Sequence, residues 1–201
     1  MCFICMGSTY ADQLSDQVSQ WRQSHEQQIV DEFAKFLSIP NVASDKSNIR
    51  KNANHISQLL KNVGMSVELL EVEGSNPVVF AERRSPGATK TVMIYIHYDG
   101  QPVNVDNWAS DPWVPVMRTD MVENGGKQVS MKAPFDPDWR IFARSAGDDK
   151  APVIALQSAL MALADRGIEP TVNLKVFLEG EEEAGSPNLR RMLEAHKDKL
   201  A

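Results

Sequence analysis

Five ionisable side chains stand out because each follows a predicted strand or opens a predicted helix: His97, Asp99, Asp148, Glu182 and Glu183. An imidazole combined with carboxylates suits Zn²⁺, and a carboxylate shared by two ions can hold them close together. A metal would also relieve the repulsion among these acids, which otherwise raise one another's pKa. An acidic calcium or magnesium site on an unrelated α/β domain is an alternative, and His97 argues against it because hard cations prefer oxygen ligands.

The stretch 92–102 positions the first two of these side chains. A run of apolar residues from Val92 to Ile96, left through Gly100 and Pro102, predicts a central strand covered on both faces. His97 and Asp99 then lie at its C-terminal end, and residues two apart on a strand point to the same side. In an open α/β sheet this edge is where ligands bind.

Two further segments bring the remaining acids towards the same edge. Residues 171–178 predict another buried strand, and four glutamates follow between Glu179 and Glu183. Such a cluster is usually a solvated turn, but its place directly after a buried strand argues against that. Residues 152–164 predict a helix that is apolar nearly all round, so Asp148 and Asp149 at its start face the interior or a cleft. Capping of the helix and complementarity to its dipole are the alternative.

The rest of the chain predicts an α/β layout. Apolar spacing and helix-ending residues indicate helices over 12–38, 49–63 and 187–200, the last with Ser186 as its N-cap. Apolar runs between turn residues indicate strands over 65–73 and 78–82, a hairpin at 125–126, and a strand over 139–144 that returns to the sheet.

Several single residues allow two interpretations. Trp108 and Trp113 lie in a predicted loop, where they could shape a pocket or simply cover the core. Lys150 is expected to pair locally with an acid. His25, His55 and His196 fall in helical patterns and are interpreted as surface or boundary residues. Cys2 and Cys5 could be half a zinc site or a redox pair, and two thiols near the terminus without such a role are favoured.

Composition sets the class of protein. The 201 residues are 42% hydrophobic with a net charge of -6, which suits one sizeable core in one or at most two domains. The acidic balance gives no footprint for nucleic acid or an anionic membrane, so small molecules or peptides are the expected partners. No apolar run approaches the ~20 residues of a membrane-spanning helix, and a cytoplasmic location is expected.

Three motifs carry a resemblance to a known family. They are His-Tyr-Asp-Gly-Gln-Pro at 97–102, Arg144 with Gly-Asp-Asp-Lys at 147–150, and Glu-Gly-Glu-Glu-Glu-Ala-Gly-Ser at 179–186. In order and spacing they resemble the co-catalytic zinc peptidases, a family of carnosinase-like dipeptidases, aminoacylases and glutamate carboxypeptidases. The first and third are most similar to the dipeptidase branch. The resemblance implies a three-layer α/β fold with a central, mostly parallel or mixed sheet.

The resemblance also implies roles for the five residues. His97 would bind one zinc ion, Glu183 the other, and Asp148 both, with Co²⁺ or Mn²⁺ as possible substitutes. Glu182 would be the general base, which takes a proton from water and returns it to the leaving amine, and Asp99 would orient His97 or its neighbours. The implied reaction is hydrolysis of a dipeptide-like bond, with amide hydrolysis of N-acyl amino acids as the alternative.

The sequence departs from the family pattern in two ways. Ala151 replaces a usual glycine, and Arg-Ser-Ala-Gly at 144–147 replaces Arg-Gly-x-x, which changes the loop and leaves the ligands. The family's last acidic and histidine ligands and its lid domain, which often dimerises, are expected to be absent. Residues 1–201 are therefore expected to be the N-terminal part of a catalytic domain, with a homodimer possible in a full-length form. A truncated, non-catalytic homologue is the competing interpretation.

Overall fold

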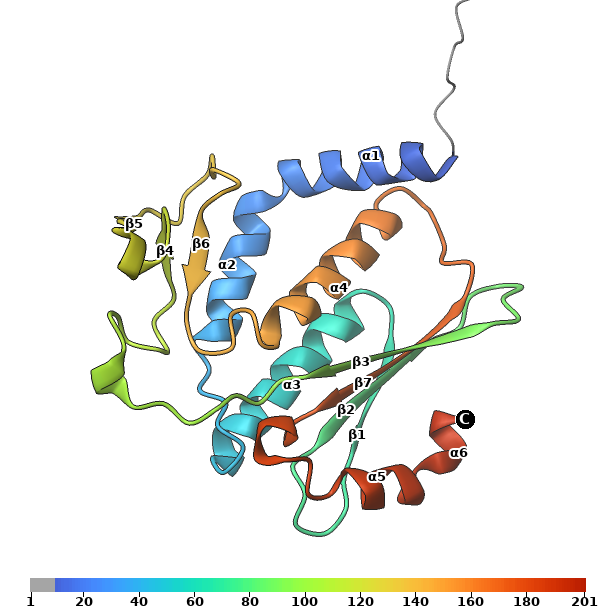
Figure 1. Cartoon of the computed structure of the whole chain (residues 1–201). Helices are drawn as coiled ribbons and strands as arrows, with labels where there is room; N and C mark the ends of the chain where they lie inside the picture. The colour runs from blue at the N-terminus through green and yellow to red at the C-terminus, as the bar shows by residue number, and fades with distance from the viewer. Residues whose placement is uncertain (1–9) are drawn as a thin grey trace, which may run out of the picture.

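Residues 10–201 are described by a computed structural model, in which helices cover a mixed four-stranded sheet (Figure 1). The strand order is β1-β2-β7-β3. These strands are β1 (Ser66–Leu70), β2 (Val78–Arg83), β3 (Thr91–His97) and β7 (Asn173–Glu179). The β1–β2 and β2–β7 pairs are antiparallel and the β3–β7 pair is parallel. The predicted α/β class with a mixed sheet is confirmed.

Two hydrophobic clusters on opposite faces of the sheet make three layers. Along β2, Val79 and Ala81 belong to a cluster with helices α3 (Lys46–Asn62) and α4 (Lys150–Ala164). Val78 and Phe80, which point the other way because strand side chains alternate, pack with Met192 of α5 (Leu189–Ala195). The remaining helices of the layers are α1 (Tyr10–Ser24), α2 (Glu26–Leu37) and α6 (Lys197–Leu200).

Helix α3 shows how the sequence sets an element. The Asp45 carboxylate accepts the Asn48 N–H at 3.1 Å as an N-cap, and Gly64 follows the helix with a φ of +80°. Between these signals the buried stripe includes Ile49, Ala53 and Ile56, as predicted.

A small second sheet lies between β3 and α4 in the chain. Its three strands, in the order β5-β4-β6, are β4 (Val116–Arg118), β5 (Gln128–Val129) and β6 (Arg140–Phe142). Short 3₁₀ helices η1 (Val105–Asn107) and η2 (Val122–Asn124) interrupt the connections. The predicted hairpin at 125–126 joins β4 to β5, but the predicted strand over 139–144 does not return to the main sheet. As β6 it pairs with β4, next to α2 in Figure 1.

Strand β3 is an edge strand, so the prediction of a central strand covered on both faces is wrong. The two interior positions belong to β2 and β7, of which β7 is buried from Leu174 to Glu179. In β3, Val92, Met93 and Tyr95 are 45%, 42% and 49% exposed. The apolar run set the strand conformation, but it carries no information about which elements cover the strand.

Two predicted helices are divided. The predicted helix over 12–38 breaks at His25, where Ser24 Oγ donates to the Trp21 carbonyl and the His25 ring stacks on Trp21. Side chains that compete for a helix carbonyl weaken the helix locally. The predicted helix over 187–200 begins only at Leu189 and breaks at His196. Ser186 is not its N-cap, because it has a φ of +51° and Asn188 occupies the cap position.

None of the helices among residues 10–201 is both long and apolar enough to span a membrane. Cys2 and Cys5 lie outside the described residues, so their interpretation stays a prediction.

Candidate metal centre

The parallel register of β3 and β7 brings two of the motifs together. His97, the last residue of β3, lies opposite Glu179, the last residue of β7. One residue further, the Tyr98 N–H donates to the Glu179 carbonyl at 2.8 Å. Because the carboxyl ends of parallel strands meet at one edge, the segments after His97 and after Glu179 leave the sheet side by side.

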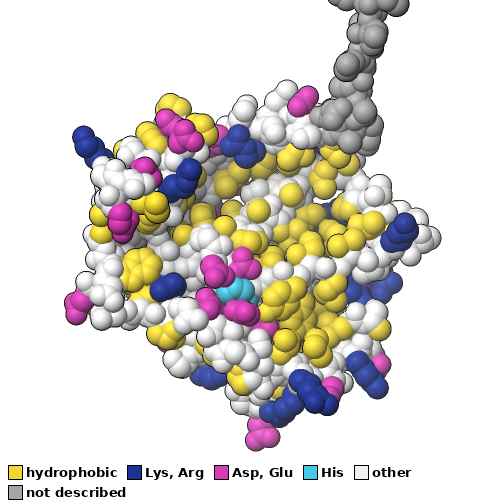
Figure 2. Space-filling view, viewed as in Figure 1, with side chains coloured by type: hydrophobic (Ala, Val, Ile, Leu, Met, Phe, Trp, Pro, Cys, Tyr) yellow, Lys and Arg dark blue, Asp and Glu magenta, His cyan; other side chains and the backbone are white. Residues whose placement is uncertain are grey.

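His97 is the residue around which the acids gather. Its Nε2 lies 2.7 Å from Asp148 Oδ1 and 3.9 Å from Glu182 Oε2, and its Nδ1 lies 3.6 Å from Asp99 Oδ1. Burial acts to lower the pKa of His97, but the carboxylates of Asp99 and Asp148 outweigh it and raise the pKa to about 9. In the space-filling view, acidic side chains surround a histidine on the open face, beside a broad hydrophobic area (Figure 2).

Asp99 is fully buried and holds the backbone of the glutamate segment. Its Oδ1 accepts the Glu182 N–H at 3.1 Å and its Oδ2 accepts the Glu183 N–H at 3.0 Å. The sequence predicted that Asp99 orients His97 or its neighbours. Its 3.6 Å distance to His97 is too long for a hydrogen bond, whereas both amide contacts have hydrogen-bond length.

Asp148 and Asp149 lie just before α4, and the peptide bond between them is cis. The Asp148 side chain is 78% exposed apart from its contact with His97. Asp149 Oδ2 accepts the backbone N–H of His97 at 3.4 Å, and burial raises the pKa of Asp149. Asp149 occupies the N-cap position of α4 but makes no side-chain capping bond to it.

Glu182 and Glu183 begin the 3₁₀ helix η3 (Glu182–Ala184), directly after β7. The Glu183 carboxylate accepts a hydrogen bond from Gln101 Nε2 at 2.6 Å, which links the first and third motifs. The structure therefore brings Asp99, Asp148 and Glu182 within 4 Å of the His97 ring, whereas the Glu183 carboxylate contacts Gln101 instead. Asp99 is connected to the third motif through the backbone amides of Glu182 and Glu183, and Glu183 is connected to the first motif through Gln101. Asp148 and Glu182 lie beside the ring of His97.

A buried scaffold that the sequence analysis missed supports this edge. Asn41 is fully buried, and its Nδ2 donates to the Tyr98 carbonyl at 2.7 Å and to Ser145 Oγ at 3.0 Å. The Tyr98 hydroxyl donates to the Pro77 carbonyl, and its ring lies against Gly180, where a Cβ would come within 2.5 Å of the hydroxyl oxygen. The sequence held no signal for Asn41 beyond its place in a turn-rich segment.

Lys150 does not pair with an acid, so that prediction is wrong. It is fully buried, and its Nζ donates to the carbonyls of Phe36 at 2.9 Å and Ile39 at 2.8 Å. Burial lowers the pKa of this lysine. Because α2 ends at Leu37, these carbonyls lie at its C-terminus, where a cation is favoured. Lys150 thus attaches the start of α4, and with it Asp148, to α2.

Trp108 and Trp113 are both half-buried, and Trp108 contacts Arg144. The Arg144 guanidinium carbon lies 5.1 Å from the centre of the Trp108 ring. The predicted boundary positions of His25, His55 and His196 are confirmed, since each is partly buried.

The donor chemistry around His97 fits a zinc ion in kind. Imidazole nitrogen and carboxylate oxygen are zinc ligands, and the closest pair is Asp148 with His97 Nε2. The buried Nδ1 of His97 has no hydrogen-bond partner. Within residues 10–201, however, no three His, Cys, Asp or Glu side chains are grouped so that they could hold one metal ion together.

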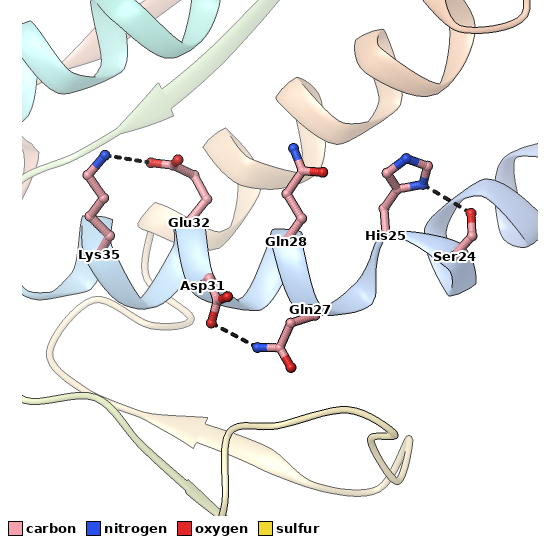
Figure 3. Close-up of a pocket in the computed structure, with 7 residues that line it drawn as sticks. All are labelled: Ser24, His25, Gln27, Gln28, Asp31, Glu32 and Lys35. Carbon is pink, nitrogen blue, oxygen red and sulfur yellow. Dashed lines mark hydrogen bonds and ion pairs between the residues drawn. The ribbon is translucent and has the colours of Figure 1, made fainter.

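A cavity of about 540 Å³ lies away from this edge, along α2. Its polar side chains largely contact one another, as Figure 3 shows for Gln27 with Asp31, Glu32 with Lys35, and Ser24 with His25. None of the five predicted site residues lines it.

A mixed α/β sheet with a histidine and several acids at the joint carboxyl end of two parallel strands defines an α/β protein with an acidic, histidine-containing site at one edge of its sheet. The particular family follows from the sequence. The model of peptidase family M20/M25/M40 matches residues 93–201, more than half of the chain. The chain belongs to this family, and the resemblance drawn from the three motifs is confirmed.

Two curated relatives are dipeptidases by name. Cys-Gly metallodipeptidase dug1 of Schizosaccharomyces pombe is 30% identical over 185 residues, which are 86% of this chain and 35% of the relative. Human Beta-Ala-His dipeptidase is 35% identical over 125 residues, which are 62% of this chain and 21% of the relative. This chain therefore spans about a third, or less, of the length of these relatives.

Solved structures show the same fold. Human carnosine dipeptidase 1 matches with a TM-score of 0.74 and 25% identity, over 91% of this chain and 38% of that chain. The M20 family metallo-carboxypeptidase Sso-CP2 from Sulfolobus solfataricus matches with a TM-score of 0.69 and 31% identity, over 86% of this chain and 35% of that chain.

Proposed function

We propose that this chain forms part of the catalytic domain of a zinc-dependent peptidase that hydrolyses dipeptide-like substrates. The observation that carries the proposal is the contact of His97 Nε2 with Asp148 at 2.7 Å, with a Glu182 oxygen 3.9 Å from the same nitrogen. A metal ligand pair and a free carboxylate beside it are the parts that metal-assisted hydrolysis needs. The names of the two curated relatives favour dipeptides over N-acyl amino acids.

In this proposal His97 and Asp148 would hold one zinc ion, and Asp148 and Glu183 a second. Co²⁺ or Mn²⁺ could replace zinc, because the same ligand types bind them. Bound zinc supplies two effects, a lower pKa of water and polarisation of the amide carbonyl.

The protein's own residues would move the proton. Glu182 is 44% exposed at its side chain, so substrate and water can reach it. It would accept the proton of the attacking water and return it to the nitrogen of the leaving amine, which is general acid–base catalysis by one carboxylate. Asp99 would keep Glu182 in reach by holding its backbone amide.

The test is zinc titration and hydrolysis of a dipeptide panel with the purified 201-residue chain. Two ligands for each ion are one fewer than the three protein ligands of a usual catalytic zinc site, so we expect weak zinc binding and little or no turnover. Asp148→Ala should abolish the zinc binding that remains, since the proposal gives this carboxylate to both ions. Equal zinc binding by wild type and Asp148→Ala would refute the proposed centre.

Tight stoichiometric zinc and robust turnover by this chain would support the peptidase but refute the ligand count. The same measurements on a longer form of the protein, where turnover is expected, would then identify the substrate. A longer form that binds zinc but hydrolyses only N-acyl amino acids would favour that substrate class over dipeptides.

A further inference from the structure

The glutamates at the end of β7 face two different environments. Glu179 and Glu181 are only 2% and 6% exposed, whereas Glu182 is exposed and Glu183 is half-buried. The role of Glu179 is local, since it accepts the Tyr95 hydroxyl at 2.7 Å. Glu181 is a buried carboxylate, adjacent to Glu182, for which the proposed reaction has no use.

The Glu181 carboxylate is satisfied by donors from the turn between β1 and β2 and from the N-cap of α5. Its Oε1 accepts the backbone N–H of Asn76 at 2.6 Å, and its Oε2 accepts Asn188 Nδ2 at 3.0 Å. The Lys46 ammonium lies 3.7 Å away. A buried carboxylate with a backbone donor and a side-chain donor is held in one place, because losing either bond would leave a buried group unsatisfied.

Asn76 extends this connection into the scaffold. It is 2% exposed, and its Nδ2 donates to the carbonyls of Gly180 at 2.7 Å and Ala43 at 2.9 Å. The turn between β1 and β2 therefore holds the chain at two adjacent residues, Gly180 through its carbonyl and Glu181 through its side chain. Both bonds lie immediately before Glu182.

On the other side, Asp99 accepts the amides of Glu182 and Glu183. Glu182 and Glu183 thus come directly after the buried carboxylate of Glu181. Their backbone N–H groups donate to a second buried carboxylate, that of Asp99. We propose that Glu181 is a positioning residue, which holds the backbone of Glu182 and Glu183 at the distance from His97 that metal binding and proton transfer require. This inference rests on the proposed function.

The experiment compares three variants of the 201-residue chain. Glu181→Ala removes the acceptor of the Asn76 amide. Glu181→Gln keeps an oxygen that can accept the Asn76 N–H. Its new NH₂ group can donate to the side-chain oxygen of Asn188 once the Asn188 side-chain amide flips. Asp45→Ala is the control, because Asp45 also accepts a backbone N–H, from Asn48, but at the start of α3.

The first readout is amide hydrogen exchange in the zinc-free chain, measured by NMR. We expect Glu181→Ala to speed exchange of the Glu182 and Glu183 amides by about tenfold or more, since local opening depends on local contacts. Glu181→Gln should stay close to wild type. Asp45→Ala should lower the melting temperature without changing exchange at these two amides.

The second readout is zinc affinity. Residues that support metal ligands typically cost ~10-fold to 100-fold in affinity when they are removed. We expect a loss on this scale for Glu181→Ala and none for Asp45→Ala. A Glu181→Ala chain that only melts earlier, with exchange and zinc affinity unchanged, would overturn the positioning role.

Failure of the proposed function and failure of the inference about Glu181 can be distinguished. If wild type binds no zinc, the proposed function fails, while the exchange measurement still decides whether Glu181 positions the glutamates. If Glu181→Ala does not fold, Asn188→Ala removes one donor to the same carboxylate and should speed the same two amides. Unchanged exchange at both amides in Asn188→Ala would refute the inference.

Discussion

At the scale of single residues, His97 lies between two carboxylates in opposite surroundings. Asp99 is fully buried and bonded to backbone amides, while the Asp148 side chain is 78% exposed. A fully buried carboxylate whose two oxygens each accept a backbone amide faces the chain and not solvent, so it is suited to orient its neighbours. An exposed carboxylate that contacts the imidazole is available to bind a metal ion. Burial therefore separates the supporting acid from the proposed ligand more clearly than residue type does.

Glu182→Gln should separate catalysis from metal binding. The change keeps the size of the side chain and removes its basic oxygen, and general-base catalysis contributes at least ~100-fold to rate. We expect turnover to fall by that factor in a form of the protein that hydrolyses dipeptides, with zinc affinity near that of wild type. Kinetics and zinc titration on the same preparation measure both. Unchanged turnover would exclude Glu182 as the base.

Gly180→Ala should destabilise the fold. The new Cβ would lie 2.5 Å from the Tyr98 hydroxyl oxygen and 2.7 Å from its ring, and Tyr98 is fully buried and cannot move aside. Overpacking of this kind costs ~1–3 kcal/mol, which urea unfolding can measure. Gly147→Ala is the control, since nothing lies within 4 Å of its Cβ. Equal losses in both variants would mean that the Tyr98 contact is not the cause.

The sequence allowed prediction of the residue types in the centre but not of the buried network beneath them. His97 and Glu182 come at or after the end of a recognisable strand and Asp148 precedes a recognisable helix, so their gathering could be expected. Glu181 looks identical to Glu182 in the sequence, and only the 3₁₀ turn after β7 makes one face inward and the other outward. Lys150 was predicted to pair with a nearby acid, because nothing close to it in the sequence points to its actual acceptors. These are carbonyls at the C-terminal end of α2, far away in the chain.

At the scale of elements, α2 and α3 meet around a partly buried histidine. His55 of α3 stacks on Phe36 at 5.1 Å, and its Nε2 lies 3.1 Å from Glu32 Oε1. Burial is the largest influence and lowers the pKa of His55. Glu32 opposes this effect, and the charges of Lys35 and Lys150 add to it.

This arrangement predicts a pH dependence of stability. The pKa of His55 is lower in the folded chain than in the unfolded chain. Once the pH falls below the ordinary pKa of 6.5, His55 therefore binds a proton more readily in the unfolded chain. Stability should therefore fall as the pH is lowered through that value towards the folded pKa. In urea unfolding, wild type should lose more stability than His55→Gln between about pH 7.5 and about pH 5.5. Equal losses would show that other groups cause the change.

Element prediction succeeded where signals were local and failed where neighbours decide. The apolar stripe and the helix-ending Gly64 gave the C-terminal end of α3 correctly, whereas the helix begins at Lys46, before the predicted start at residue 49, because Asp45 caps it. The apolar run of β3 is compatible with a central or an edge strand, because its backbone forms ladder bonds equally well with one neighbour or two. Likewise, no feature within β6 states that β4, rather than the main sheet, is its partner.

At the scale of the whole molecule, the edge of β3 is the most exposed apolar feature of the main sheet. Its only ladder partner among residues 10–201 is β7, and Val92, Met93 and Tyr95 are open to solvent. A flat, apolar edge with unpaired backbone groups invites pairing with another strand. We therefore expect the isolated chain to self-associate as its concentration rises.

Met93→Lys should reduce this association, because a charge on an edge strand opposes pairing. The measurement is the average mass by light scattering across a concentration series. Met121→Lys is a matched control, since Met121 is 51% exposed and lies outside β3. Equal effects of both substitutions would point to net charge rather than to the edge of β3.

The segment between the first and second motifs begins and ends at almost the same point. The chain passes Gly100 after leaving β3 and comes back beside it at Arg144, before α4, where the Arg144 Cδ is 3.2 Å from the position of a Cβ on Gly100. Loop-closure entropy grows only with the logarithm of loop length, so a stretch whose two ends already touch tolerates insertion and deletion cheaply. Residues 103–143, with the small second sheet, are thus where this architecture can gain, lose or exchange a subdomain while the spacing from His97 to Asp148 in space stays the same.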